Sequence, residues 1–542
     1  MYLLVLSYVF ASLVHLVYGR DPRYAGPEIA ARLNSGEYLR NIKQTVQRNI
    51  ENAPPVPKQV VQNNVTAKFI VDGKKIPEVN FDVGESYAGS IPIGSSNNTS
   101  LFFWYFPTTN PDGKNDLTIW LNGGPGCSSL EGFLQENGPF LWNYGTFKPV
   151  KNPWSFQRLS NTLWVEQPVG TGFSHGDATE YSEEMIATSF LAWFKNFMDT
   201  FELHGKKIYI AGESYAGLYI PYIADAMFNK KDKKYFDLRG TMIYDGSINT
   251  DAIMSAAPTY GYVKAYDNIF QLNDTFMAEV EQTAKTCGYI DYVEKYLTYP
   301  PKGKLPQPTL PTSFADRRKC KSLWGRILDA VSAVNPCFNY YQITTSCPLL
   351  WDVLGFPGSF EYLPEGASVY FDRADVKKAI NAPTNIKWEE CSTIPLSIAD
   401  MSEPSSWSVL PRVIERSERT ILGHGGLDYV LLANGTLLSI QNMTWNGAQG
   451  FQKPVKSDFF VPYHDEESQS TMSGSGVQGV THTERGLTYV EVFMSGHMIP
   501  QYAPSSAYRH LEFLLGRIES LSERTGFTTQ RHIPQPRDRK IL

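Results

Sequence analysis

The feature of the sequence that most constrains its fold is a series of short apolar segments, each ending in glycine or a polar residue. The segments are NTLWVEQP, KIYIAGES, GTMIYDGS, RTILGHGG and TYVEVFMSG, and helical stretches such as residues 183–201 lie between them. Strands that alternate with helices favour a mainly parallel sheet that helices cover on both faces. We therefore predict an α/β fold, with the earlier segments TAKFIV, SLFFWYF and LTIWL as further strands.

One long stretch, between residues 255 and 368, interrupts this alternation. It contains four of the six cysteines, the proline-rich YPPKGKLPQPTLP and several helical segments, so we predict an insertion that caps the main sheet. The α/β domain then consists of a first part at residues 61–254 and a second part at residues 369–525. A polar tail, residues 526–542, follows it.

The first 60 residues lie ahead of the predicted domain. Residues 1–19 form an apolar segment with Val17 and Gly19 at its end, small residues at the positions that a signal peptidase requires. No lysine or arginine precedes the apolar run, which leaves an uncleaved anchor as the alternative to a signal peptide. Residues 20–60 are amphipathic and end in prolines, and we expect either a docked helix or a removable propeptide.

The remaining sequence fits export. No later segment is long and apolar enough to span a membrane, and the C-terminal end carries no lipid-anchor pattern. We therefore expect a protein of the secretory pathway, either secreted or delivered to a vacuole or lysosome-like compartment. The six cysteines are even in number and allow fifteen disulfide pairings. Glycosylation sequons begin at Asn64, Asn97, Asn98, Asn273, Asn434 and Asn442.

Composition excludes several classes of protein. The formal net charge of −6 over 542 residues is too small to suggest a nucleic-acid partner. The nine histidines and six cysteines show no CxxC or HExxH grouping, so we expect no metal site. With 42% hydrophobic and 13% aromatic residues, the chain is apolar enough to build a large folded core. Nothing in the sequence sets an oligomeric state.

The hexapeptide GESYAG occurs twice, at residues 84–89 and 212–217. A serine nucleophile needs a sharp turn between a buried strand and a helix. The second copy has that context, because the apolar KIYIA precedes it and the mostly helix-compatible YAGLYIPYIADAMF follows it. In this copy Ala216 replaces the second glycine of G-x-S-x-G, and Pro221 should kink or divide the helix. The first copy lies among turns and alternating residues, so we assign Ser86 to an early β-hairpin and the nucleophile role to Ser214.

A serine nucleophile also requires a histidine that takes its proton and an acid that orients the histidine. In α/β-hydrolases these residues follow in the order serine, acid, histidine. Asp428 lies just beyond the strand RTIL, and His497 follows the strand in TYVEVFMSG, at carboxyl ends of strands where active groups of open α/β sheets gather. Their alternative roles are a turn residue and a buried structural histidine. His482 and His510 are assigned to the surface or to packing.

The segment IWLNGGPGCSS, residues 119–129, predicts the loop that stabilises the oxyanion in an acyl-transfer site. Three glycines and one proline within residues 122–126 directly follow a strand, which is more than a plain turn requires. Glycine lets a backbone approach a ligand closely, so we expect backbone N–H groups of this loop to face the reacting carbonyl.

Four motifs, WLNGGPGCSSLEGFLQENGPF, VEQPVGTGFS, GESYAG and SGHMIP, occur in this order, and residues 65–520 resemble the serine carboxypeptidases. The resemblance implies an α/β-hydrolase fold with an inserted cap. It also implies removal of single amino acids from the C-termini of peptides and proteins, through an acyl-enzyme and without a cofactor. It makes Ser214, Asp428 and His497 the catalytic triad, and it gives the oxyanion hole to the backbone N–H groups of Gly124 and Tyr215.

The resemblance further implies how the substrate is held. Carboxyl groups that face the substrate's terminal carboxylate cannot all be ionised, so they share protons and at least one glutamate pKa should be raised. Binding weakens as these protons leave, which predicts activity favoured at acid pH. For Glu213 the alternative is a structural acid buried at the turn. The implied substrate-binding residues are Asn122, Gly123, Glu136 and Glu213, with Met498 on the leaving-group side.

The resemblance also suggests a Cys127–Cys391 disulfide beneath the site. We expect the four cysteines of the insertion to pair in a nested pattern, Cys287–Cys347 and Cys320–Cys337. One position departs from the family pattern. The stretch before the catalytic acid is Gly-Asp-x-Asp in the family and Gly-Gly-Leu-Asp here, so Gly426 replaces the first acid.

Two other functions remain as alternatives to a carboxypeptidase. One is an acyltransferase that uses the same triad, which the set of Asn122, Glu136 and Glu213 disfavours because these residues would hold a free carboxylate. The other is a catalytically silent secreted glycoprotein. Loss of a triad residue would favour it, and none is lost.

Overall fold

The computed structural model describes residues 63–95, 98–355, 366–464 and 474–530. The predicted signal peptide at residues 1–19, the segment at residues 20–60, the sequon at Asn97 and most of the polar tail lie outside these ranges. Among the described residues, no helix has both the length and the apolar character needed to cross a membrane.

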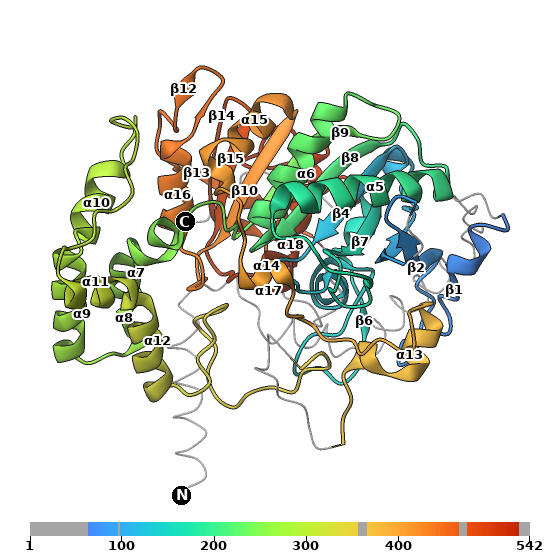
Figure 1. Cartoon of the computed structure of the whole chain (residues 1–542), viewed down its shortest axis with the longest axis horizontal. Coiled ribbons are helices and arrows are strands. Elements are labelled where there is room, and N and C mark those ends of the chain that lie inside the picture. Colours follow the sequence, from blue (N-terminus) through green and yellow to red (C-terminus); the bar gives the residue numbers. More distant parts are fainter. Residues whose placement is uncertain (1–62, 96–97, 356–365, 465–473, 531–542) are drawn as a thin grey trace, which may run out of the picture. The chain divides into compact units, whose positions relative to one another are not determined.

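A mixed sheet of 11 strands forms the centre of the described chain (Figure 1). The strands of the structure are β1 (Ile70–Val71), β2 (Ser86–Pro92), β3 (Ser100–Phe106), β4 (Asp116–Leu121), β5 (Phe140–Leu141), β6 (Val150–Lys151), β7 (Asn161–Glu166), β8 (Lys207–Glu213), β9 (Asp237–Tyr244), β10 (Arg419–Gly425), β11 (Thr444–Trp445), β12 (Ala448–Gln449), β13 (Ser457–Val461), β14 (Gly476–Glu484) and β15 (Leu487–Val492). The order in the large sheet is β1-β2-β3-β7-β4-β8-β9-β10-β15-β14-β13. Its middle, from β7 to β15, is parallel, and antiparallel strands extend both edges.

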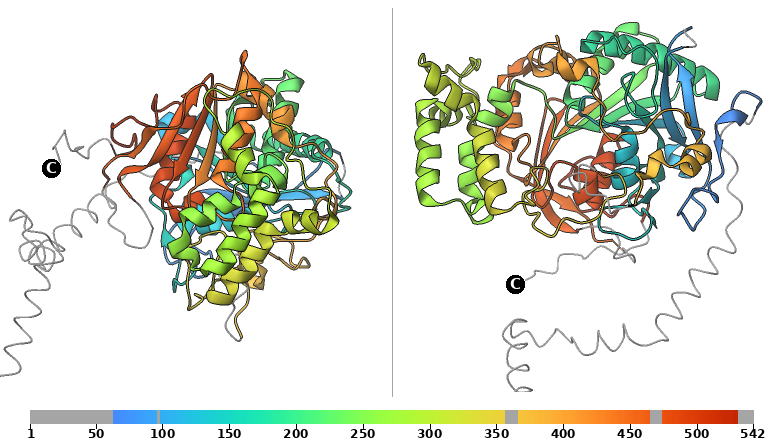
Figure 2. Two further views of the ribbon diagram at one scale, coloured as in Figure 1. Left: turned by 90° about the vertical axis from the view of Figure 1, so that its left-hand side faces the viewer. Right: turned by 60° about the horizontal axis from the view of Figure 1, so that its bottom comes forward.

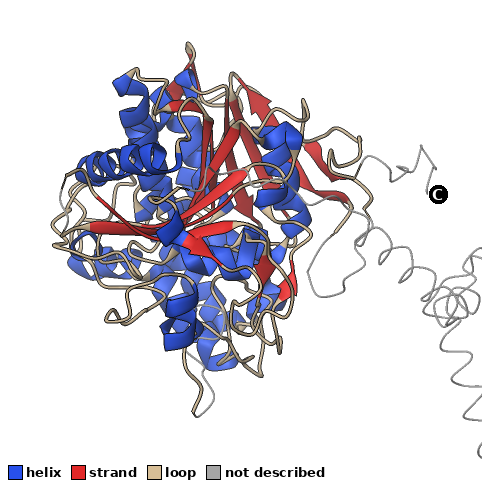
Figure 3. Ribbon diagram, turned by 90° about the vertical axis from the view of Figure 1, so that its right-hand side faces the viewer, coloured by secondary structure: helices blue, strands red, loops and turns tan. Residues whose placement is uncertain are grey.

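Helices cover both faces of this sheet (Figure 3). They are α4 (Ser129–Gly132), α5 (Glu183–Phe201), α6 (Ala216–Lys230), α7 (Thr259–Ala265), α8 (Asp267–Phe270), α9 (Asp274–Thr286), α10 (Tyr289–Tyr296), α11 (Phe314–Lys321), α12 (Leu323–Val334), α13 (Ala374–Ala379), α14 (Pro395–Ile398), α15 (Val409–Arg416), α16 (Ala433–Asn442), α17 (Ile499–Tyr502) and α18 (Pro504–Leu514). Successive strand residues point to opposite faces. On β8, Ile208 and Ile210 join the apolar cluster of α5 and α6, while Tyr209 and Ala211 join that of α18. The predicted α/β fold is confirmed.

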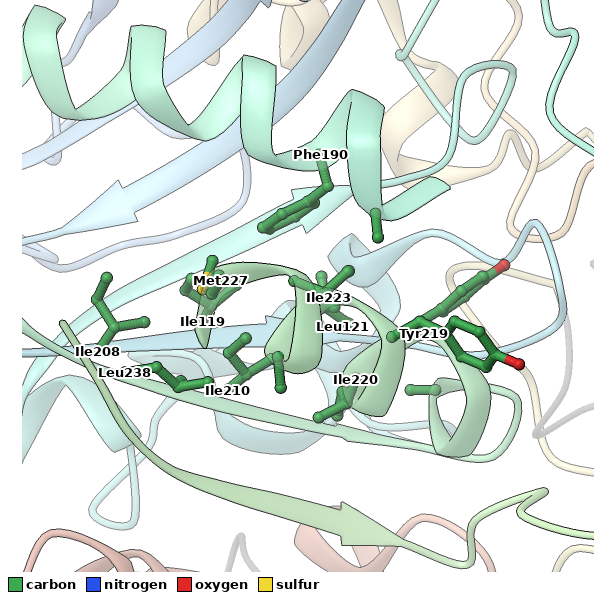
Figure 4. Close-up of a cluster of buried hydrophobic side chains, with 14 of the residues drawn as sticks. Ile119, Leu121, Phe190, Ile208, Ile210, Tyr219, Ile220, Ile223, Met227 and Leu238 are labelled. Atoms are coloured by element: carbon green, nitrogen blue, oxygen red, sulfur yellow. The ribbon is translucent and has the colours of Figure 1, made fainter. Parts of the chain in front are cut away.

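Helix α6 packs on the centre of the sheet through one apolar face. Figure 4 shows four of its side chains gathered over strand residues of β4, β8 and β9, with Phe190 of α5 beside them. Each such side chain contributes about 1.5–3 kcal/mol when it is fully buried. The four residues are Tyr219, Ile220, Ile223 and Met227, and the strand residues are Ile119, Leu121, Ile208, Ile210 and Leu238.

Of the two expectations for Pro221, a kink or a division of the helix, the division is wrong, because α6 is continuous from Ala216 to Lys230. A proline has no N–H for the carbonyl four residues earlier, which here belongs to Gly217. The hydroxyl of Ser405 donates a hydrogen bond to that carbonyl oxygen at 2.6 Å and replaces the missing partner. The helix therefore keeps the conformation that presents its N-terminal end to the loop after β8.

The long connection from β9 to β10 contains helices α7 to α12, at the place where the sequence predicts an insertion. These helices share an apolar cluster built around Val263, Val280, Ile327 and Val331, which also includes Tyr429 beyond β10. In Figure 1 and in the right-hand view of Figure 2, α9 to α12 stand together beside the sheet. That this segment acts as a cap over the site stays a prediction.

The disulfide pairing expected for this segment is wrong. Cys287 bonds to Cys320 with the Cα atoms 5.7 Å apart, and Cys337 bonds to Cys347 with the Cα atoms 5.1 Å apart. The nested pattern assumed that the first and last cysteines meet. Instead α9 packs against α11, so the cysteine after α9 lies beside the one within α11. The second bond closes the short loop that follows α12.

Candidate active site

The candidate catalytic residues follow three strands of the parallel part of the sheet, β8, β10 and β15, with β9 between the first two. Ser214 comes directly after β8, Asp428 lies three residues beyond the end of β10, and His497 lies five residues beyond the end of β15. Because parallel strands end at the same edge of a sheet, the three loops lie on one side of the molecule. The sequence places them there through apolar strands that stop at glycine or polar residues.

Ser214 occupies a strained turn between β8 and α6. Its backbone φ is 59°, the left-handed region that residues other than glycine seldom adopt. The turn is held from outside, because the Ser214 N–H donates to the carbonyl of Tyr244 and the Ser214 carbonyl accepts from Ser247 N–H, both at 2.9 Å. A strained backbone conformation persists only where the surrounding structure holds it in place. Here the strained turn leaves Ser214 half-buried at the end of β8.

His497 and Asp428 form a buried hydrogen-bonded pair. The His497 Nδ1 lies 2.8 Å from the Asp428 Oδ2, and the two side chains are 2% and 0% exposed. Asp428 also accepts a hydrogen bond from the Val430 N–H at 2.7 Å, so the pair is oriented from both ends. An ionised carboxylate only accepts, so Nδ1 carries the proton. The other ring nitrogen, Nε2, has no hydrogen-bond partner in the described part of the chain.

The glycine-rich loop after β4 lies against the turn that holds Ser214. A Cβ atom on Gly123 would lie 2.5 Å from the Tyr215 N and 2.7 Å from the Ser214 Cβ, so only glycine fits there. The next residue, Gly124, has φ 111°. The loop is fixed by the Cys127–Cys391 disulfide, which the family resemblance implies, and by the Ser128 N–H donating to the Glu390 carbonyl at 2.7 Å.

Asn122 stands at the centre of a buried cluster of carboxyl groups. Its Nδ2 donates to the Glu136 Oε1 at 3.3 Å and to the Glu213 Oε1 at 3.1 Å. The same amide donates to Glu131, and its Oδ1 accepts from the indole N–H of Trp120 at 2.7 Å. The three glutamates are at most 4% exposed. The three carboxyl groups bring oxygen atoms within 4.8 Å of one another.

The cluster holds protons at pH values where an exposed glutamate has lost them. Burial, together with the neighbouring carboxyl groups, raises the pKa of Glu131, Glu136 and Glu213 well above the ordinary glutamate value. Three buried carboxyl groups this close together cannot all be ionised, so at least one of them carries a proton. The cluster can therefore donate hydrogen bonds to an anionic group that arrives beside it.

Glu131 is a member of this cluster that the sequence analysis did not identify. It lies on α4, and residues Phe133–Asn137 continue that helix as a wider π-helical turn. A π-helical turn places residues five positions apart on one face, which brings Glu131 and Glu136 together. The signal in the sequence is a pair of acids in an otherwise apolar segment beside the glycine-rich loop.

Two groups among the described residues bring ligand atoms close enough to hold a cation. One is the cluster of three glutamates, and the other consists of Asp245, Asp428 and His497. In the second group the 2.8 Å hydrogen bond between His497 and Asp428 joins two of the three side chains, and in the first Asn122 donates to all three glutamates.

The other predicted site residues are placed as follows. Met498 is 2% exposed and directly follows His497. His510 is buried in α18 with its Nδ1 3.0 Å from the Tyr244 hydroxyl, and His482 lies in β14 beside Glu484. Among the sequons, Asn442 is half-buried and the other described ones are exposed, namely Asn64, Asn98, Asn273 and Asn434.

Comparison with known proteins agrees with the four motifs. The family model of serine carboxypeptidases matches residues 77–516. A probable serine carboxypeptidase of Arthroderma benhamiae is 56% identical over 521 residues, which cover 91% of this chain and 97% of the relative. Serine-type carboxypeptidase F of Aspergillus niger is 44% identical over 501 residues, which cover 89% and 93%. The crystal structure of Kex1, a prohormone-processing carboxypeptidase of Saccharomyces cerevisiae, shares the fold with a TM-score of 0.65 at 22% identity, over 84% of this chain and 98% of that one.

Proposed function

The chain belongs to the serine carboxypeptidase family, and we propose that Ser214, His497 and Asp428 are the triad with which it releases C-terminal amino acids. The observation that carries this assignment is the His497–Asp428 hydrogen bond of 2.8 Å, with Nε2 of the same ring left without a partner among the described residues. A histidine bound in this way at Nδ1 presents a basic nitrogen to a serine hydroxyl. Ser214 follows β8, which β9 separates from β10, and it occupies the kind of turn that exposes a nucleophile.

The reaction proceeds in two steps. As the Ser214 Oγ attacks the last peptide carbonyl, its proton passes to the His497 Nε2, and the resulting imidazolium is held by Asp428. The negative oxygen that forms is stabilised by the backbone N–H groups of Gly124 and Tyr215. His497 then gives the proton to the departing amine, which leaves an acyl-enzyme ester on Ser214. A water molecule, activated by the same nitrogen, hydrolyses the ester.

The carboxyl cluster binds the free carboxylate of the substrate's last residue. Asn122 and Gly123 lie between the Ser214 turn and the glutamates, so a carboxylate held by Glu136 and Glu213 stands close to the scissile bond. A protonated glutamate donates a hydrogen bond to the carboxylate, whereas an ionised one repels it. Because the pKa values in the cluster are raised, binding is strong at acid pH and weakens as the pH rises. Met498 lines the side of the pocket that receives the leaving residue.

Export through the secretory pathway completes the proposal. Three disulfides join all six cysteines, and bonds of this kind form and persist in oxidising compartments. Four of the sequons are exposed in the described part of the chain, where an oligosaccharide can be attached.

The test uses a blocked dipeptide with a free C-terminus and the same dipeptide with a C-terminal amide, at about pH 5 and about pH 8. We expect release of the last residue from the free acid at acid pH and little from the amide. A serine-directed phosphonate then reports the nucleophile, and mass spectrometry should find it on Ser214 and not on Ser86. Equal turnover of acid and amide would contradict the carboxylate assignment, and a label elsewhere would contradict the triad.

A further inference from the structure

A second buried carboxyl group, that of Asp245, lies against the acid of the proposed triad. Asp245 directly follows β9, and neither it nor Asp428 has any exposed surface. Ligand atoms of Asp245, Asp428 and His497 all lie within 4.8 Å of one another. The Asp245 Oδ2 is buried and has no other hydrogen-bond partner among the described residues. Two buried carboxyl groups this close together are not both ionised, so one of them carries a proton that it can share with the other.

The hydrogen bonds around the pair indicate which carboxyl group holds that proton. Asp428 accepts from His497 Nδ1 at 2.8 Å and from the Val430 N–H at 2.7 Å, and also more weakly from the Leu431 N–H at 3.4 Å. Asp245 accepts from one backbone N–H, that of Gly425 at 2.8 Å. Negative charge is stabilised where more donors converge, so Asp428 is the carboxylate and Asp245 the acid.

The remaining ionisable neighbours support the same assignment. Burial, then the charge of Asp428 and also that of Glu491, raise the pKa of Asp245. His424 lies 3.4 Å from the Asp245 Oδ1, but its Nε2 donates to the Leu431 carbonyl at 2.8 Å and burial lowers its pKa to about 4. A neutral His424 supplies no positive charge that would ionise Asp245.

The backbone of Asp245 is fixed as firmly as its side chain. Its φ is 44°, and its N–H donates to the Gly423 carbonyl of β10 at 2.9 Å. With the bond from Gly425, this connects the end of β9 to the end of β10, from which Asp428 extends. Position 426, where the family pattern has an acid, is glycine here, and the carboxyl group beside Asp428 is that of Asp245, directly after β9.

We propose that Asp245 is a positioning residue, whose protonated carboxyl donates a hydrogen bond to Asp428 and fixes the carboxylate that orients His497. The inference rests on the proposed roles of Ser214, His497 and Asp428. Asp245 touches no reacting atom and acts only through Asp428. Its contribution lasts while it keeps its proton and ends when the pH rises through its pKa.

The decisive variant is Asp245→Asn. An amide has the same shape as a protonated carboxyl, and the Gly425 N–H requires its oxygen, so its NH₂ group must face Asp428. This donor cannot ionise. We therefore expect kcat at acid pH close to that of the wild type, and an alkaline limb of the kcat profile displaced upward by about one pH unit or more. Asp245→Ala removes the donor and should lower kcat about 10- to 100-fold with little change in KM.

The assay uses an ester substrate without a terminal carboxylate, from about pH 5 to about pH 10, so that titration of the glutamate cluster does not enter. Asp237→Asn is the matched control, because it makes the same change at the other end of β9, about 26 Å away along the strand. Its profile should coincide with the wild type.

Two results would overturn the inference. One is an alkaline limb for Asp245→Asn that coincides with the wild type, and the other is an Asp245→Asn variant as slow as Asp245→Ala, since the amide supplies the same hydrogen bond. Ser214→Ala is assayed in parallel. If Ser214→Ala stays active, the proposed triad is wrong. If Ser214→Ala is inactive and the alkaline limb of the Asp245→Asn profile coincides with the wild type, only the proposed role of Asp245 is wrong.

Discussion

The chain contains the same six residues, GESYAG, at the start of β2 and at the end of β8. Strand β2 pairs antiparallel with β1 and β3 near one edge of the sheet, whereas β8 lies between two parallel strands at its centre. After the first copy the chain continues in the strand. After the second it turns through Ser214 into α6.

The serines of the two copies differ in conformation and in partners. Ser86 is 1% exposed and accepts a hydrogen bond from the indole N–H of Trp104 at 3.2 Å. Ser214 is half-buried at φ 59°, beside the glycine-rich loop. The hexapeptide does not determine its own structure. The apolar helical sequence that follows the second copy, and the strand that follows the first, decide between a nucleophile turn and a hairpin.

The largest difference between the copies should appear when each serine is changed to alanine. Ser214→Ala removes the attacking oxygen, and we expect kcat for a free-acid dipeptide to fall at least about 10⁴-fold. Ser86→Ala should leave kcat unchanged and lower the free energy of unfolding by about 1–3 kcal/mol, because the buried Trp104 N–H loses its acceptor. Steady-state kinetics and thermal unfolding measure the two effects. A large loss of kcat in Ser86→Ala, with the fold intact, would contradict the assignment of a purely structural role to Ser86.

The first glycine of each copy is required for a different reason. A Cβ on Gly212 would lie 2.1 Å from the Leu121 carbonyl oxygen of the neighbouring strand, whereas Gly84 has open space around it but a φ of 89°. Gly212→Ala must push β4 and β8 apart, which should cost about 3 kcal/mol of stability and reduce activity. Gly84→Ala should cost about 1–2 kcal/mol of backbone strain and leave activity intact. Thermal unfolding of both variants measures the two losses of stability. A larger loss for Gly84→Ala than for Gly212→Ala would contradict this prediction, because it would show that the strands β4 and β8 can accommodate the added Cβ.

The glutamates of the two copies should differ in their effect on the pH dependence of KM. Burial and its neighbours raise the pKa of Glu213, so the protons of its cluster leave as the pH rises above the ordinary glutamate range and KM for a free-acid substrate should increase. Glu213→Gln removes one ionising group, and we expect the rise in KM between about pH 5 and pH 8 to shrink about 10-fold. Glu85→Gln changes an acid that accepts a hydrogen bond from the Tyr87 hydroxyl in its own copy, and KM should follow the wild type. A Glu213→Gln profile as steep as the wild type would place the titrating groups elsewhere.

Much of the fold could be predicted because each parallel strand is a compact apolar run that stops at glycine or a polar residue. The edges were harder to predict. In TAKFIV only Ile70 and Val71 form a strand, and β13 and β14 alternate too weakly in polarity to be recognised. The cysteine pairing within the insertion depends on how α9 packs against α11, which no local pattern records.

The same reasoning explains what the sequence shows of the site. The rule that active groups follow parallel strands leads to Ser214, Asp428 and His497. It could also have led to Asp245, which follows β9 in the segment GTMIYDGS. Glu131 required knowledge of the π-helical turn after α4, because in a regular helix it would face away from Glu136.

The tyrosines should show the smallest difference between the copies. The Tyr215 hydroxyl donates to Asp400 and its ring packs 5.2 Å from that of Tyr219, whereas its backbone N–H is the proposed oxyanion donor. Tyr215→Phe keeps the N–H and loses one hydrogen bond near the nucleophile, so kcat/KM should fall about 5-fold. The Tyr87 hydroxyl donates to Glu85 at 2.7 Å, far from the site in the sheet, and Tyr87→Phe should cost about 1 kcal/mol of stability without a change in kcat/KM. We therefore expect steady-state kinetics to distinguish Tyr215→Phe from the wild type, and thermal unfolding to distinguish Tyr87→Phe from it. The reason is that only in the second copy does the tyrosine adjoin the nucleophile.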